Sequence, residues 1–213
     1  MSAFAELSQL IFPSRCFGCH VLGPSICSAC RSSWHPHYYK TKFDGLTVHS
    51  ALVYTPTASK IILAAKESGL KGADELLMDA ITHVLEKAIP DNALYRLVPV
   101  PSSKASQRRR GRSFIVDLVS QISQRTGIPM IDCLQLSRRV LDQSGLHRDE
   151  RATNLAGAFS LRSRRMRPSP ARKILSTNAG IDLAFRWGWN PYSRPYRRGW
   201  ATQAVIAVTE PTA

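Results

Sequence analysis

Residues 94–100 read Leu-Tyr-Arg-Leu-Val-Pro-Val, and residues 114–126 read Phe-Ile-Val-Asp-Leu-Val-Ser-Gln-Ile-Ser-Gln-Arg-Thr. The first stretch is a short apolar run beside prolines, which predicts a buried strand. The second repeats apolar residues at intervals of three and four, which predicts a helix that ends at Gly127. A buried strand followed by an amphipathic helix is the basic unit of an α/β domain.

Further elements of the same kinds are expected on both sides of this unit. The apolar patterns predict strands at residues 47–54, around Leu175 and at residues 205–208, and helices at residues 3–11, 59–68 and 73–88. Because strands and helices alternate, we expect an α/β fold with a largely parallel sheet.

Four cysteines near the N-terminus, Cys16, Cys19, Cys27 and Cys30, have the spacing C-x2-C-x7-C-x2-C. Two such pairs can supply the four thiolates of a tetrahedral zinc site. Gly18, and Gly23 before a proline, suit the tight turns of such a module. We therefore expect structural zinc, with a redox pair, an iron–sulfur site or disulfides as the alternatives.

The chain shows no pattern of a targeting or membrane segment. No run of 18 apolar residues occurs, so no membrane span is expected. The first residues lack a basic start and include Glu6, unlike a signal peptide. We expect a cytoplasmic protein with reduced thiols, in which the isolated Cys133 is a small buried apolar residue.

The formal net charge of +14 is concentrated in the middle of the chain. Residues 1–95 carry 8 basic and 8 acidic side chains, residues 96–173 carry 17 and 5, and residues 174–213 carry 4 and 2. Such a block suits a polyanion, either nucleic acid or a phosphorylated small molecule; the alternative is an ordinary solvated face. If the partner is single-stranded DNA, the expected binding residues are Arg108, Arg109, Arg110 and Arg112.

Three further segments occur in a characteristic order. They are Ile11-Phe12-Pro13 directly before the cysteines, Leu97-Val98-Pro99-Val100-Pro101-Ser102-Ser103 followed by Arg110-Gly111, and Gln143-Ser144-Gly145-Leu146 with Arg151 and then Asn154-Leu155-Ala156-Gly157-Ala158-Phe159. Together they resemble the ComF competence-protein family, also described as GntX-like or amidophosphoribosyltransferase-like.

The resemblance implies a type I phosphoribosyltransferase-like domain at residues 46–213, preceded at residues 1–45 by a helix and the zinc module. Such domains bind 5-phosphoribosyl-1-pyrophosphate (PRPP) with Mg²⁺ at the carboxyl ends of parallel strands. By this resemblance, the pyrophosphate would lie at Ser102, Ser103 and Lys104, under a lid that carries Gln143 and Arg151. Alternatively, the arginines of the lid segment are simply solvated.

The chain departs from the family where the fold holds the ribose 5′-phosphate. That site needs two adjacent acidic residues and a Thr-Thr-Gly-type turn that opens a helix. Here residues 176–182 read Ser-Thr-Asn-Ala-Gly-Ile-Asp, and residues 186–198 are rich in tryptophan, proline and arginine. The C-terminal third is therefore atypical. Residues 176–198 are interpreted as a displaced reading frame, or as a base-stacking surface built from Trp187, Trp189, Tyr192 and Tyr196.

Two functions remain as hypotheses. The first is a phosphoribosyltransferase-like protein associated with DNA uptake or utilisation, with the DNA-uptake machinery as its partner. Its catalysis would be impaired, and Mg²⁺ with PRPP would bind only if the missing motif were restored. The second is a non-enzymatic, zinc-containing nucleic-acid-binding protein.

Overall fold

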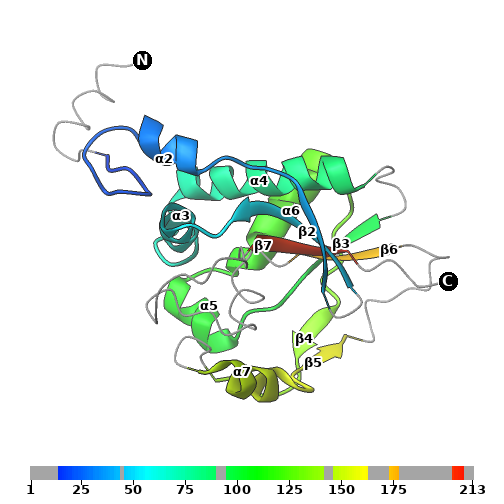
Figure 1. Ribbon diagram of the computed structural model, residues 1–213. Coiled ribbons are helices and arrows are strands. Elements are labelled where there is room, and N and C mark those ends of the chain that lie inside the picture. Colours follow the sequence, from blue (N-terminus) through cyan, green and yellow to red (C-terminus); the bar gives the residue numbers. More distant parts are fainter. Residues whose placement is uncertain are drawn as a thin grey trace.

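The computed structural model describes residues 14–43, 46–89, 95–141, 146–162, 173–177 and 203–208 (Figure 1). The helices are α2 (Ser28–Ser33), α3 (Pro56–Lys66), α4 (Lys71–Ala88), α5 (Lys104–Arg110), α6 (Phe114–Thr126) and α7 (Arg148–Leu155). The strands are β1 (Tyr39–Phe43), β2 (Leu46–Val53), β3 (Tyr95–Pro99), β4 (Leu134–Leu136), β5 (Phe159–Leu161), β6 (Lys173–Thr177) and β7 (Gln203–Val208). The fold is mixed α/β, as expected.

The central sheet has the strand order β1-β2-β7-β6-β3. Only β3 and β6 pair in parallel, and the other neighbours are antiparallel. On the far side of β3, Leu97 exchanges backbone hydrogen bonds with Pro129 and Ile131 at 3.0 and 2.8 Å, next to a parallel bridge at Met130. The sheet therefore has a parallel half around β3 and an antiparallel half around β2.

The prediction of a largely parallel sheet is wrong for the described strands. β1 ends at Phe43 and β2 begins at Leu46, and so short a connection can only join antiparallel neighbours. β7 then lies between β2 and β6 and is antiparallel to both. Apolar patterns predict where a strand lies, but the direction of its neighbours is set by the connections between strands.

The predicted elements that fall within the described residues are found, whereas α2, α5, α7, β1, β4 and β5 were not predicted. The predicted strands are found as β2, β3, β6 and β7, and the predicted helices as α3, α4 and α6. The helix expected at residues 3–11 lies outside the described residues, as does the segment from 178 to 198. Thr55 begins α3 by accepting a hydrogen bond from the N–H of Ala58 at 3.1 Å, ahead of a proline in the first turn.

The main core forms where α3, α4 and α6 pack with one another and with β2 and β3. Its largest fully buried side chains include Ile61 of α3, Leu85 of α4, Leu97 of β3, and Phe114 and Leu118 of α6. The cysteine loop and α2 lie at one end of the molecule, and the β4–β5 hairpin and α7 lie at the other (Figure 1). None of the described helices is long and apolar enough to span a membrane.

A buried ion pair joins the helices of this core. Arg112, in the turn between α5 and α6, donates to both carboxylate oxygens of the buried Asp74 at 2.6 and 2.8 Å. It also donates to the carbonyl oxygen of Ala65 at 2.6 Å, and its guanidinium lies 4.9 Å from the ring centroid of Phe114. The hydrogen bond to Asp74 raises the pKa of Arg112 against the opposing effect of burial. One cation thus connects the end of α3, the start of α4 and the start of α6.

Replacement of Arg112 by Ala should reduce the free energy of unfolding by about 3–5 kcal/mol, because it leaves the charge of Asp74 buried and unpaired. The matched control is Arg125→Ala, which breaks the exposed 2.6 Å ion pair with Asp79. Arg125→Ala should lower the free energy of unfolding by no more than about 1 kcal/mol. Urea denaturation of both variants measures the difference, and equal costs would contradict a structural role for the buried pair.

Candidate metal centre

The four cysteine thiols converge on one point. Their sulfur atoms all lie within 4.8 Å of one another. The Sγ of Cys27 lies 3.7 Å from the Sγ of Cys16 and 3.7 Å from that of Cys19. Four sulfurs at the corners of a tetrahedron, each 2.3 Å from zinc, are about 3.8 Å apart. The cluster can therefore hold a structural metal ion, and its spacing fits zinc.

Local backbone geometry brings the two cysteine pairs together. Cys16 and Cys19 flank a turn in which the N–H of His20 donates to the carbonyl of Cys16 at 2.9 Å. His20 adopts a positive φ of 63°, which closes this turn. Cys27 and Cys30 belong to the cap and first turn of α2, where the backbone N–H of Cys27 lies 3.4 Å from the sulfur of Cys16. N–H groups aimed at sulfur stabilise a thiolate there.

The thiols differ in acidity when no metal is bound. For Cys16, burial acts to raise the pKa, but hydrogen bonds from the backbone of Cys27, Cys19 and Gly18 outweigh it and lower the pKa to about 6. For Cys30, burial and hydrogen bonds to the neighbouring thiols raise the pKa to about 12. Without a metal, the backbone thus favours the thiolate of Cys16 and burial disfavours that of Cys30, for which a divalent cation would supply the balancing charge.

The cysteine module packs directly on the helices of the main domain. A Cβ atom at Gly18 would lie 2.7 Å from the sulfur of Cys30 and 2.9 Å from the methyl group of Thr57 in α3. Gly18 was predicted to serve a tight turn, and the structure adds that no side chain fits between the cluster and α3. The ring of Phe17 lies against Gly72 of α4. The residues beside the cysteine cluster are therefore the same residues that pack the module against α3 and α4.

The residues predicted to bind pyrophosphate lie at the carboxyl end of β3. Ser103 caps α5, and its hydroxyl accepts a hydrogen bond from the N–H of Ser106 at 3.2 Å. The carbonyl of Ser102 accepts from the side chain of Gln107 at 3.0 Å, and Lys104 is exposed at the start of α5. Gln143 lies outside the described residues, whereas Arg151 belongs to α7.

The four arginines predicted to bind nucleic acid divide into two groups. Arg110 donates to both carboxylate oxygens of Glu67 at 3.1 and 3.2 Å, and Arg112 is engaged in the buried pair. Arg109 also pairs with Glu67, at 3.9 Å, but its side chain is 59% exposed against 7% for Arg110, and Arg108 is exposed as well. Sequence analysis missed the internal pairing because the carboxylate partners stand 43 and 38 residues away along the chain.

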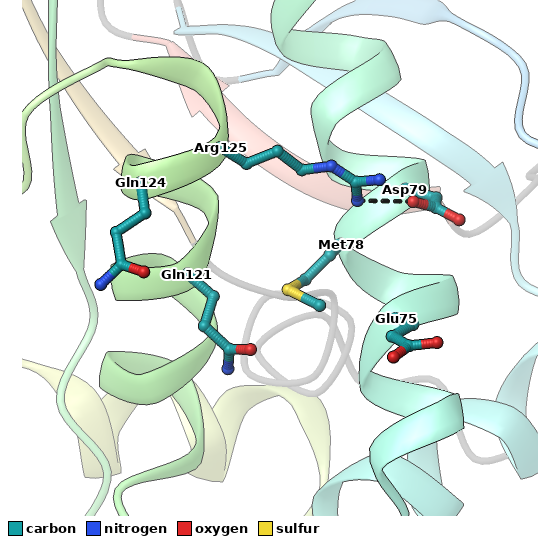
Figure 2. Close-up of a pocket in the computed structure, with 6 residues that line it drawn as sticks. All are labelled: Glu75, Met78, Asp79, Gln121, Gln124 and Arg125. Atoms are coloured by element: carbon teal, nitrogen blue, oxygen red, sulfur yellow. Dashed lines mark hydrogen bonds and ion pairs between the residues drawn. The ribbon is translucent and has the colours of Figure 1, made fainter.

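A surface groove of about 540 Å³ lies between α4 and α6. Figure 2 shows Arg125 of α6 reaching across it to Asp79 of α4. The other lining residues are Glu75, Met78, Gln121 and Gln124. No residue predicted to bind a ligand lines this open groove, and we assign it no role in the proposed functions.

Protein purified under reducing conditions should contain one zinc ion per chain, and Cys27→Ser should release it and destabilise the module, because structural zinc contributes folding free energy. The control is Cys133→Ala, which removes a buried thiol outside the cluster and should leave the zinc content unchanged. Elemental analysis by mass spectrometry measures the metal. Zinc-free wild-type protein, or full zinc content in the Cys27 variant, would contradict the assignment.

Comparison with known proteins leaves the identity of the chain open. No family model matches the sequence, and no curated protein matches it.

Proposed function

We propose that this chain is a phosphoribosyltransferase-like protein of the ComF type, associated with DNA uptake or utilisation and impaired in catalysis. Its sequence segments resemble that family in order, and its zinc-compatible module precedes an α/β domain. The observation that carries the proposal is the parallel pairing of β3 and β6, which has Pro99 opposite Thr177.

Parallel strands bring their carboxyl ends to one edge of the sheet. The loop from Val100 to Ser103 therefore leaves the sheet beside the point where the chain leaves β6 after Thr177. Ligands of α/β proteins bind at such an edge. Exposed Lys104 and the hydroxyls of Ser102 and Ser103 supply the charge and hydrogen bonds that a pyrophosphate needs.

The same edge supplies little to hold a ribose 5-phosphate. After Thr177 the sequence continues Asn-Ala-Gly-Ile-Asp, without the adjacent acidic residues or the Thr-Gly turn of active enzymes. Each hydrogen bond to a charged phosphate contributes about 1.5–3 kcal/mol, and the missing turn would make three or four. At about 1.4 kcal/mol per tenfold change, the loss corresponds to roughly a thousandfold or more in affinity.

Calorimetric titration with PRPP and Mg²⁺ should accordingly show weak binding or none. Reading codons 176–198 in the other two frames should reveal an acidic pair, a Thr-Gly turn and an alanine-rich helix. A chain carrying that restored segment should bind PRPP, and Ser103→Ala with Lys104→Ala should weaken the binding. A sub-micromolar dissociation constant for the chain as it stands would contradict this account, and so would the absence of family-like sequence from both frames.

A second candidate is a non-enzymatic protein that binds single-stranded DNA. The observation that favours it is the exposure of Arg108 and Arg109 on α5, in a chain of net charge +14. Arg110 and Arg112 are already paired with carboxylates. We therefore propose that binding would use the exposed Arg108 and Arg109, the second of which also lies 3.9 Å from Glu67.

Replacing Arg108 and Arg109 by Gln should reduce the slope of log K against log salt by about 1.4, because each single-strand phosphate contact contributes about 0.7. Arg125→Gln, at an exposed arginine of α6, should leave the slope unchanged. Fluorescence anisotropy with an oligothymidine strand at several salt concentrations measures both. The same slope in the double variant and the wild type would exclude α5 as the binding surface.

A further inference from the structure

β4 and β5 form a small two-stranded antiparallel sheet whose strands are joined through α7, here named the β4–β5 hairpin. It has one apolar face and one polar face. Leu134 pairs with Leu161, and Leu136 pairs with Phe159. Side chains directly opposite one another on antiparallel strands lie on the same face, so these four apolar side chains form one surface. On the other face, the amide of Gln135 donates to the hydroxyl of Ser160 at 3.3 Å.

The apolar face is partly open to solvent. Phe159 is 38% exposed and Leu161 is 56% exposed, while the two leucines of β4 are half-buried. The main element contacts of this hairpin are between its own two strands, and it lies at the end of the molecule opposite the cysteine loop (Figure 1). An isolated two-stranded hairpin is marginally stable, and clustered exposed apolar side chains mark an interaction surface.

Hydrogen bonds nevertheless join the two strands of the hairpin at both ends. At one end, the N–H of Ser137 donates to the carbonyl of Ala158 at 2.9 Å, and its hydroxyl donates to the carbonyl of Gly157 at 3.0 Å. At the other end, the N–H of Arg162 donates to the carbonyl of Cys133 at 2.8 Å. The apolar face is therefore formed in advance, which reduces the entropy lost when a partner binds.

The segments that follow the two strands are basic. Arg138 and Arg139 follow β4 after Ser137, and Arg162 directly follows β5. Arg138 donates to the neutral backbone carbonyls at the end of α7, so its charge is retained. The nearby Asp132 is already paired with Arg162 at 2.9 Å. Counting these four side chains, the rim carries a net positive charge.

We propose that the β4–β5 hairpin is a docking surface for an acidic polypeptide segment with apolar side chains. The apolar face requires apolar anchors, and the basic rim favours acidic residues beside them. A second copy of this chain would bring the same positive rim, on a molecule of net charge +14. A nucleic acid would supply the negative charge but no aliphatic side chains. The proposal is independent of the proposed function.

The test uses the full chain and a fluorescein-labelled peptide of eight residues in which leucine and glutamate alternate. Two control peptides replace glutamate by lysine or leucine by serine. Fluorescence polarisation should show saturable binding of the leucine–glutamate peptide and binding about tenfold or more weaker for each control, because each control lacks one of the two interactions. Equal binding of the lysine peptide, or no binding of the leucine–glutamate peptide, would overturn the proposal.

Two variants locate the binding on the hairpin. Leu161→Glu should lower the affinity for the leucine–glutamate peptide about tenfold or more and raise the affinity for the leucine–lysine peptide. An unfolded variant would not show this gain. Gln135→Ala, on the polar face, should leave both affinities unchanged. Unchanged affinity in Leu161→Glu would overturn the proposal.

Two other occupants are tested with a second variant at the same position, Leu161→Ser. Sedimentation equilibrium that shows a dimer in the wild type and a monomer in Leu161→Ser would assign the face to a second copy of the chain. Loss of oligothymidine binding in Leu161→Ser, with the peptide unaffected, would assign it to nucleic acid. Either result would overturn an acidic polypeptide as the occupant.

Discussion

The ion pair between Arg112 and Asp74 is the contact on which the arrangement of the helices depends. It connects the turn before α6 to the first turn of α4 and, through the carbonyl of Ala65, to the last turn of α3. The cysteine module packs on α3 at Thr57 and on α4 at Gly72. A buried charge pair is costly to desolvate and is tolerated only where both partners are well hydrogen-bonded. The guanidinium of Arg112 donates to both oxygens of Asp74 and to the carbonyl of Ala65, although its Nε is buried without a hydrogen-bond partner. These bonds connect the three helices.

Local patterns were sufficient to predict four strands and three helices of the described chain, and the clustering of the four cysteines. The periodicity of residues 114–126 defines α6, and the spacing of the cysteines identifies the cluster without any knowledge of the fold. Contacts between distant residues were not predictable in this way. The pairing of Arg110 with Glu67, and the position of β7 between β2 and β6, depend on how the chain packs as a whole. The hairpin face was missed because three-residue alternations such as Leu134–Leu136 are too short to stand out.

The cysteine cluster, the carboxyl end of β3 and the β4–β5 hairpin lie on different parts of the fold. The cysteine cluster brings together four thiols from a turn and a short helix, an arrangement typical of a structural metal site. At the carboxyl end of β3, Lys104 is exposed. The hairpin offers a third surface that is apolar rather than charged. The proposed anion-binding residues and the proposed docking surface thus lie on different elements of the chain.

The central place of β7 has a consequence for how the chain reaches its folded state. β7 (Gln203–Val208) pairs with β2 (Leu46–Val53) on one side and β6 (Lys173–Thr177) on the other. During synthesis, the hairpin of β1 and β2 is therefore made before β7 and cannot join the parallel half of the sheet until residues 203–208 have left the ribosome. Such long-range closure is slow and leaves strand edges exposed in the meantime. Nascent chains that stall before residue 203 would thus present two unconnected half-sheets to chaperones.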